Sequence, residues 1–164
     1  MSTITFKGDA INTIGTLPSV GENAKNSTLV AGDLSEKSIS DFKGKNIILN
    51  IFPSVNTGVC ATSVRKFNED AAKLDNTVVL CISKDLPFAQ SQFCAAEGIE
   101  NVVMLSDFRT QFGEEYGVTM TDGPLKGLLS RSVIAINPEG KVTYTEQVPE
   151  ITQEPNYDAA LKAF

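Results

Sequence analysis

The feature that most constrains the fold is one stretch of the chain, residues 46–74. Its apolar run Ile47–Phe52 is typical of a buried strand, and a short turn begins at Pro53. After the turn, apolar residues recur with the period of an amphipathic helix at Val64, Phe67, Ala71 and Leu74. Cys60 lies where this helix should begin. The free N–H groups and the dipole of a helix N-terminus favour an anion, so this position favours a thiolate, the reactive form of cysteine.

The remaining segments predict an α/β protein with a mixed sheet. The expected strands occupy a hairpin within residues 3–15 and the segments 77–83, 102–105, 131–136 and 141–146. The expected helices occupy residues 87–97, 108–116 and 156–164. Short strand or turn segments at 27–34 and 38–42 precede the central strand. This order of elements predicts one domain, residues 1–164, with helices on both faces of the sheet.

Charge and hydropathy limit the classes of function. The net charge of −6 argues against a nucleic-acid or anionic-membrane partner. No apolar run approaches the roughly 18 residues that a membrane span needs. The N-terminal sequence MSTITFKGDA lacks the basic and apolar regions of a signal peptide. We therefore expect a cytoplasmic protein with no membrane partner and no nucleic-acid partner.

The chain contains three cysteines and no histidine. The lack of histidine excludes Ser-His and Cys-His catalysis and histidine-ligated zinc. Because the cysteines form no CxxC motif, we expect no metal site, and nothing in the sequence indicates haem, flavin or a nucleotide. Cysteines in a cytoplasmic protein rarely form a permanent disulfide framework, so these three are core residues or redox groups. An activated cysteine here must rely on Arg or Lys, hydrogen bonds and a helix terminus.

Cys60 and Cys81 differ in their sequence surroundings. Cys60 follows the carboxyl end of a buried strand, where open α/β sheets place their sites. It also ends the pattern Pro53-x-x-x-Thr57-x-x-Cys60. Both features favour a functional role over simple core packing. Cys81 lies inside the apolar run 77–83, so we expect it to be a core residue.

Cys94 is ambiguous from its position alone. It lies on the predicted helix 87–97, which Gly98 should end, and it is one step away from an apolar stripe formed by Ala89, Phe93 and Ala96. We therefore expect it at the border of the buried face. A silent Cys94 and a reactive Cys94 are both consistent with that position.

Arg131 is the candidate cation for the Cys60 thiolate. It opens the predicted strand 131–136. If that strand runs antiparallel to residues 47–52, its start lies beside the end of the latter, and Arg131 faces Cys60. A surface ion pair explains Arg131 equally well from the sequence alone.

The segment PSVNTGVC, Pro53–Cys60, resembles the Pro-x-x-x-Thr-x-x-Cys signature of the peroxiredoxins. Three longer segments resemble the bacterial thiol peroxidases, the atypical two-cysteine subfamily: LNIFPSVNTGVCATSVRKFN, NTVVLCISKDLPFAQSQFCAAEG and DGPLKGLLSR. The resemblance covers nearly the whole chain. It implies a thioredoxin-like fold in which helices flank a central mixed sheet and a β-hairpin extends the N-terminus.

By this resemblance Cys60 is the peroxidatic cysteine and Cys94 is the resolving cysteine, and the two form an intrachain disulfide during turnover. Thr57 and Arg131 are the other polar site residues, and Pro53 shields the site. Thr57 occupies the position at which thioredoxins carry the first cysteine of CxxC. That difference distinguishes a peroxide reducer from a dithiol exchanger.

The resemblance also implies a thiol-dependent peroxidase that reduces hydrogen peroxide and organic hydroperoxides in antioxidant defence and redox homeostasis. It implies thioredoxin as the reductant, a homodimer and no cofactor, and Cys81 corresponds to a position that turnover does not need. The apolar residues Phe52, Val59 and Leu128 are expected to admit an alkyl group. Phe88 is expected either at an interface or in the core.

Disulfide formation is expected to require a conformational change. A disulfide needs Cα atoms within roughly 7 Å, and these two cysteines lie on separate helices. We therefore expect the first turn after Pro53 and the region around Cys94 to unwind partly. Three alternatives stay open: a dithiol-disulfide oxidoreductase on the same fold, a redox sensor in which Cys60 oxidation signals to a partner, and a purely structural domain.

Overall fold

The central strand of the sheet is β5, Asn46–Ile51, as the apolar run predicts. It pairs in parallel with β6, Thr77–Ser83, and antiparallel with β8, Ser132–Ile136. These strands are buried over most of their length because each has a neighbour on both edges and a covering layer on both faces. The computed structural model describes residues 2–164, so Met1, the first residue of the predicted domain, lies outside the described residues.

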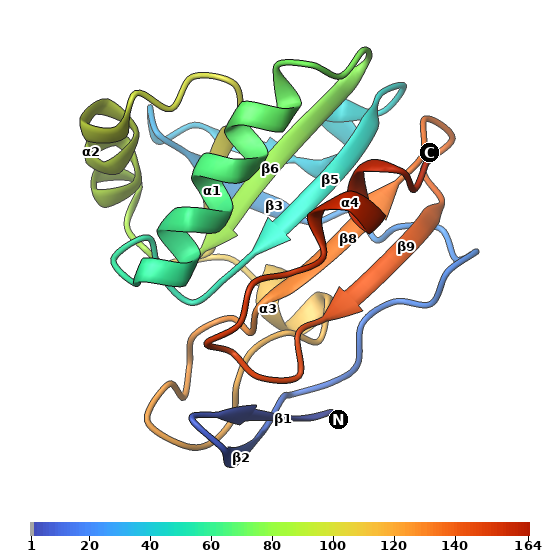
Figure 1. Cartoon of the computed structure of the whole chain (residues 1–164). Coiled ribbons are helices and arrows are strands. Elements are labelled where there is room, and N and C mark those ends of the chain that lie inside the picture. Colours follow the sequence, from blue (N-terminus) through green and yellow to red (C-terminus); the bar gives the residue numbers. More distant parts are fainter. Residues whose placement is uncertain (1) are drawn as a thin grey trace.

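Within the described residues the full sheet has seven strands in the order β4-β3-β7-β6-β5-β8-β9 (Figure 1). The other four strands are β3, Thr28–Ala31; β4, Glu36–Ser38; β7, Val103–Ser106; and β9, Val142–Gln147. Strands β5, β6 and β7 are parallel to one another, whereas the remaining pairs are antiparallel. The sheet is therefore mixed, which confirms the predicted fold class.

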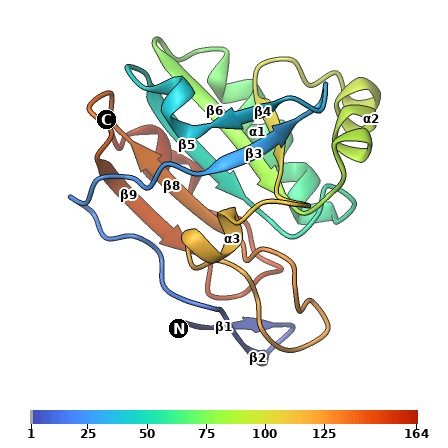
Figure 2. The same ribbon diagram turned by 180° about the vertical axis from the view of Figure 1, so that it is seen from behind.

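The predicted N-terminal hairpin is present as β1, Thr3–Phe6, and β2, Asp9–Asn12. Its two turn residues are Lys7 and Gly8, and both have positive φ angles, as tight hairpin turns require. The hairpin lies beyond the end of the sheet at which β5 and β6 terminate (Figures 1 and 2). The hairpin can therefore cover side chains that lie at the carboxyl ends of β5 and β6.

The helices cover both faces of the sheet. α1, Gly58–Ala71, and α4, Tyr157–Leu161, lie on one face (Figure 1). The short α3, Phe112–Glu115, and the 3₁₀ helix η1, Ile39–Phe42, lie on the opposite face, which Figure 2 shows. α2, Pro87–Glu97, packs beside β7 at the edge of the α1 face. An apolar cluster fills the space on each side of the sheet.

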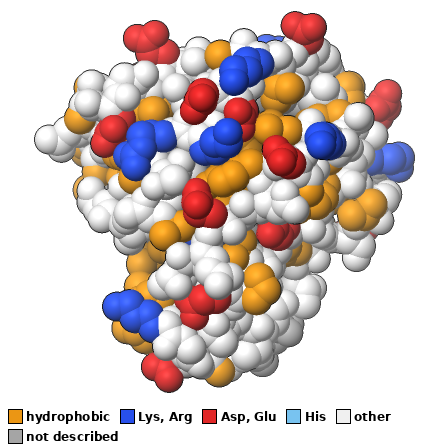
Figure 3. Space-filling view, in the orientation of Figure 1, with side chains coloured by type: hydrophobic (Ala, Val, Ile, Leu, Met, Phe, Trp, Pro, Cys, Tyr) orange, Lys and Arg blue, Asp and Glu red, His pale blue; other side chains and the backbone are white. Residues whose placement is uncertain are grey.

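The face that carries α1 and α4 has positive and negative side chains interspersed over it (Figure 3). Two of its ion pairs are Arg65 with Glu97 at 3.4 Å and Lys66 with Asp70 at 3.5 Å. Exposed pairs of this kind contribute about 1 kcal/mol or less, so the apolar clusters supply most of the stability. No helix within residues 2–164 combines the length and the apolar character that crossing a bilayer demands.

Two helices are shorter than the sequence predicts. The expected helix 108–116 is reduced to α3 because the buried Asp107 carboxylate accepts hydrogen bonds from the N–H groups of Phe112 and Gly113. Those bonds start the helix there, as a capping carboxylate does. The expected terminal helix 156–164 is reduced to α4, which ends at residue 161.

The inward face of α2 differs from the predicted stripe. Ala96 is exposed, whereas Gln90 is only 1% exposed. Gln90 is buried because its amide donates to the Ser83 hydroxyl at 3.1 Å and to the Leu105 carbonyl at 2.9 Å. The spacing of apolar residues does not predict the burial of a polar side chain that finds hydrogen-bond partners in the core. Cys94, one turn further on, is half-buried, at the border of the face as predicted.

Candidate active site

Cys60 lies in the first turn of α1, just after the carboxyl end of β5. Its side chain is 0% exposed and belongs to the apolar cluster beneath α1. Thr57, with an extended backbone, is the N-cap residue. The N–H groups of the first turn and the helix dipole favour negative charge at this position.

Arg131 contacts the Cys60 sulfur. Its Nη2 donates a hydrogen bond to Cys60 Sγ at 3.2 Å, and its Nε donates to the Ile151 carbonyl at 2.8 Å. The placement follows from the antiparallel pairing of β5 with β8, in which Ile51 is opposite Ser132. The structure therefore places the guanidinium where antiparallel pairing predicts it, and the alternative of a surface ion pair is wrong.

The Arg131 guanidinium is 2% exposed and stays charged at any physiological pH. The ion pairs within residues 2–164 involve other residues, so no carboxylate of the described chain neutralises it. A buried charge without a counter-ion is costly. The Cys60 sulfur is the side-chain atom that this guanidinium contacts through Nη2.

A second guanidinium nitrogen, Arg131 Nη1, is buried and has no hydrogen-bond partner among the described residues. Leaving a buried donor unpaired costs about 1–3 kcal/mol. The nitrogen belongs to a residue that lines a cavity of about 320 Å³. The guanidinium group therefore borders that cavity.

The cavity brings together the predicted site residues Pro53, Thr57 and Arg131. The rest of its wall is mostly apolar, with Phe6, Val59, Leu125, Leu128 and Ile151. The expectation that Phe52 lines the site is wrong. Phe52 continues the path of β5, with its N–H bonded to the Ile82 carbonyl at 3.1 Å, and its ring is 0% exposed in the core.

The Thr57 hydroxyl holds the turn in front of α1. It donates to the Ser54 carbonyl at 3.1 Å, and the Thr57 N–H bonds to the same oxygen at 3.2 Å. The side chain therefore borders the cavity while its hydroxyl closes the turn.

The N-terminal hairpin supplies one wall of the cavity through Phe6 and Lys7. The Glu150 carboxylate fastens the hairpin turn by accepting hydrogen bonds from the N–H groups of Lys7 at 3.2 Å and Gly8 at 2.9 Å. The backbone N–H groups of Thr152 and Gly8 lower the pKa of Glu150 to about 2. Sequence reasoning missed these residues because no local pattern links a hairpin turn to a loop so far along the chain.

Among residues 2–164, the other two cysteines lack a cationic partner in hydrogen-bonding contact. Cys81 is 0% exposed in β6, and burial raises the pKa of its thiol to about 12, although the Asn50 amide at 3.6 Å opposes the shift. Burial also raises the pKa of the Cys94 thiol. All three cysteines are free thiols. The predicted place of Cys81 in the core is confirmed.

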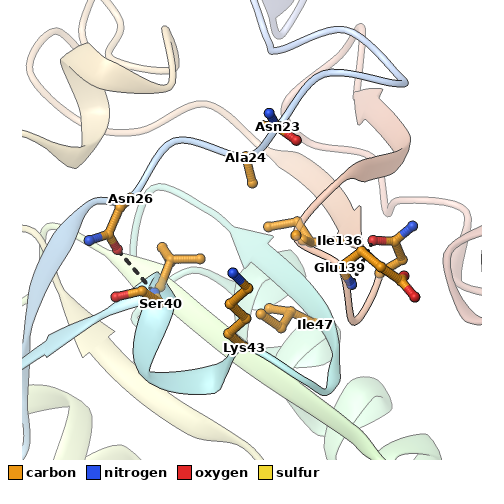
Figure 4. A pocket seen from close by; sticks show the side chains of 11 residues that line it. Asn23, Ala24, Asn26, Ser40, Lys43, Ile47, Ile136 and Glu139 are labelled. Carbon is orange, nitrogen blue, oxygen red and sulfur yellow. Dashed lines mark hydrogen bonds between the residues drawn. The ribbon is translucent and has the colours of Figure 1, made fainter.

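A second cavity of about 310 Å³ lies at the opposite end of the central sheet (Figure 4). Its wall includes Asn23, Asn26, Lys43 and Glu139, and the Asn26 side-chain oxygen Oδ1 accepts a hydrogen bond from the Ser40 N–H at 3.0 Å. It contains no cysteine. No group of three or more Cys, Asp or Glu side chains in the described part of the chain could hold a metal ion.

Comparisons with known proteins find one family of similar sequences, and the matches cover nearly the whole chain. The family described as Redoxin matches residues 19–161. The thiol peroxidase of Mycobacterium tuberculosis is 60% identical over 163 residues, which cover 99% of this chain and 98% of that protein. The thiol peroxidase of Corynebacterium glutamicum is 60% identical over 158 residues, which cover 96% of each chain.

A solved structure shows the same fold. The crystal structure of a peroxiredoxin-like protein from Aquifex aeolicus superposes with a TM-score of 0.93 at 42% sequence identity. The match covers 98% of this chain and 94% of that chain. The mixed sheet, its helices and the N-terminal hairpin are thus features of a known architecture.

Proposed function

The chain belongs to the redoxin family and is a thiol-dependent peroxidase, and on this premise we propose that Cys60 is the sulfur that attacks the peroxide. The observation that carries the proposal is the 3.2 Å hydrogen bond from Arg131 Nη2 to Cys60 Sγ. It gives one buried sulfur a permanent cationic partner, and that partner, Arg131, lines the cavity. The fold is thioredoxin-like, and the substrate class is hydroperoxides, hydrogen peroxide and organic hydroperoxides included.

The first step forms a sulfenic acid. The Cys60 thiolate attacks the terminal oxygen of the peroxide, the S–O bond forms and the O–O bond breaks. The leaving oxygen takes the bonding electrons and a proton and departs as water or an alcohol. We propose that the Arg131 guanidinium, which lines the cavity, donates to the peroxide and stabilises charge on the leaving oxygen. We assign Thr57 and Pro53 to the wall that positions the peroxide, because both line the cavity.

The second step forms a disulfide within one chain. The Cys94 sulfur attacks the Cys60 sulfenic acid, the S–S bond forms and water leaves. Disulfide geometry demands Cα atoms within roughly 7 Å, so we propose that the turn after Pro53 and the region around Cys94 unwind partly. A thioredoxin-type protein then reduces the disulfide by thiol exchange. Cys81 is not needed for any of these steps.

The cavity wall supports organic hydroperoxides among the substrates. Val59 and Leu128 line it as expected, and Phe6, Leu125 and Ile151 extend the apolar surface. An alkyl group bound there removes apolar area from water, worth about 25 cal/mol per Å². The hydroperoxide group would then point toward Arg131.

We also propose a homodimer in the cytoplasm. Phe88 is 65% exposed, so the expectation that it packs in the core is wrong. Leu86, two residues earlier, is 50% exposed. Two large apolar side chains together on the surface support an interface at the start of α2.

One experiment tests the assignment of the cysteines. Peroxide consumption with a thioredoxin reductant is measured for the wild type, Cys60→Ser, Cys94→Ser and Cys81→Ser. We expect no turnover for Cys60→Ser and one oxidation without thioredoxin-dependent recycling for Cys94→Ser. We expect a rate within about twofold of the wild type for Cys81→Ser, because core substitutions far from reacting atoms act mainly on stability. Retained turnover in Cys60→Ser would contradict the proposal.

The same assay separates the alternatives. Insulin reduction without peroxide would favour a dithiol-disulfide oxidoreductase. A peroxide rate near that of a free thiol, with a stable oxidised form, would favour a redox sensor. A structural domain would leave Cys60→Ser indistinguishable from the wild type in every redox assay.

A further inference from the structure

A cluster of hydrogen-bonded groups next to the cavity centres on Asp85, which lies between β6 and α2. Its Oδ1 accepts a hydrogen bond from the Ser54 hydroxyl at 2.7 Å, and its Oδ2 accepts one from the Val55 N–H at 2.9 Å. Ser54 and Val55 belong to the turn that leads into α1. One carboxylate therefore holds the turn that places the reactive cysteine.

The same carboxylate is linked to α2 through Ser83, the last residue of β6. The Ser83 hydroxyl donates to Asp85 Oδ2 at 2.7 Å, and the Gln90 amide donates to the Ser83 hydroxyl at 3.1 Å. Gln90 lies one helical turn before Cys94. We call Ser54, Val55, Ser83, Asp85 and Gln90 the Asp85 cluster. It is a continuous chain of hydrogen bonds from the turn before α1 to the helix of the proposed resolving cysteine.

We propose that Asp85 is a positioning residue that holds the reactive turn against the start of α2 during peroxide reduction and releases both for disulfide formation. The proposal rests on the proposed function of Cys60 and Cys94. Hydrogen bonds to an ionised carboxylate are about twice as strong as neutral ones, so Asp85 is the member whose loss weakens the cluster most. None of its hydrogen-bond partners is hydrogen-bonded to the Cys60 sulfur, so we expect its effect to be exerted through the backbone.

This arrangement predicts opposite effects on the two chemical steps. Peroxide attack needs the turn in its folded position, so a weaker cluster slows it. Disulfide formation needs the turn and α2 to separate from their folded positions, so a weaker cluster speeds it. General loss of stability would not accelerate one defined step while slowing the other.

The competing chemistry gives a second readout. When the Cys60 sulfenic acid meets another peroxide before Cys94 reaches it, the sulfur gains a second oxygen. The product is a sulfinic acid, and the peroxide leaves as water or an alcohol. Faster disulfide formation leaves less time for this reaction. A weaker Asp85 cluster should therefore lower the yield of sulfinic acid at high peroxide.

The test is a rapid-quench experiment on the reduced full-length protein, in which mass spectrometry measures sulfenic acid, disulfide and sulfinic acid over time. For Asp85→Ala we expect peroxide attack about tenfold slower and disulfide formation about tenfold faster, as loss of bonds to a charged acceptor predicts. Asp85→Asn should restore part of both rates. Its amide oxygen can still accept from the Val55 N–H, and the Ser54 hydroxyl can turn to accept from the amide N–H₂.

Two further variants serve as controls. Asp33→Ala removes a carboxylate that also accepts two hydrogen bonds, from the N–H and hydroxyl of Ser35, in a turn between β3 and β4, and both rates should stay at wild-type values. Ser54→Ala should shift both rates in the same directions as Asp85→Ala but less, and the double variant should add little, because both residues act through one contact.

The outcomes separate this inference from the proposed function. Wild-type protein that forms no sulfenic acid at Cys60 would overturn the proposed function itself. A normal wild type, with both rates of Asp85→Ala and Asp85→Asn within twofold of it, would overturn only the role of Asp85. Equal slowing of both steps in Asp85→Asn would also overturn it, because that is the result of a merely structural residue.

Discussion

Cys60 and Cys81 have the same burial and different polar neighbours. Both are 0% exposed, and both belong to the apolar cluster on the α1 face of the sheet. Cys60 has the Arg131 guanidinium at 3.2 Å and the N-terminus of α1 around it. Cys81 lies in the middle of β6, and its sulfur accepts a hydrogen bond from the Asn50 amide at 3.6 Å. The polar neighbour, and not the depth of burial, therefore distinguishes the two sulfurs, and on it we base the proposal that Cys60 is the reactive one.

The difference also shows why the site lies where it does. A sulfur at the centre of a strand has no free backbone N–H groups beside it, because the ladder uses them all. A sulfur in the first helical turn has several. The start of β8 then adds a cation at the same end of the sheet, because β8 runs antiparallel to β5. The order and direction of the strands therefore place the Arg131 guanidinium beside Cys60 and not beside Cys81.

The largest effect should come from removing the cation. In Arg131→Met, peroxide reduction should slow by about a hundredfold to a thousandfold, the usual cost of losing a donor that stabilises transition-state charge. Arg131→Lys keeps a positive charge but loses the planar fork of N–H donors. Its rate of peroxide reduction should therefore lie between that of the wild type and that of Arg131→Met. The measurement is the second-order rate with cumene hydroperoxide, with circular dichroism to verify folding. An unchanged rate in Arg131→Met would show that the cationic partner is not what makes Cys60 differ from Cys81.

A smaller effect concerns Cys81 and alkaline stability. Burial raises the pKa of its thiol from 9.0 to about 12, so above pH 9 the unfolded chain loses this proton while the folded chain keeps it. The stabilisation is fully present below pH 9 and is lost as the pH rises toward 12, at about 1.4 kcal/mol per pH unit.

The check is urea unfolding of the wild type and Cys81→Ala at several pH values between 8 and about 11. The free energy of unfolding should fall less steeply with pH in Cys81→Ala, because the titrating thiol is gone. Parallel curves for the two proteins would show that Cys81 is not the neutral core residue described here. The peroxide rate of Cys81→Ala at pH 7 should stay within about twofold of the wild type.

Much of the site could be predicted from the sequence because its parts are local or follow from strand pairing. The β5–turn–α1 unit is continuous in the chain. Its apolar residues form an unbroken run in β5 and recur every three to four residues in α1, and these are the patterns of a buried strand and an amphipathic helix. The position of Arg131 needed one assumption, the antiparallel pairing of β5 and β8, which the structure confirms.

The parts that could not be predicted depend on single side chains that bond to distant backbone. Gln90 is a polar residue that faces inward because its side-chain N–H donates a hydrogen bond to the Leu105 carbonyl. Asp107 shortens the helix after it by capping later N–H groups. Glu150 fastens a hairpin turn from the other end of the chain. Periodicity reports which faces are apolar, and it carries no information about such pairs.

The most direct test of the central claim is to find which sulfur receives the oxygen first. Reduced Cys94→Ser protein, in which a sulfenic acid cannot be resolved by Cys94, is mixed with one equivalent of cumene hydroperoxide and a sulfenic-acid trap. Peptide mass spectrometry then locates the adduct. We expect it on Cys60, formed far faster than with free cysteine, and none on Cys81. An adduct on Cys81, or one on Cys60 that forms no faster than with free cysteine, would contradict the account.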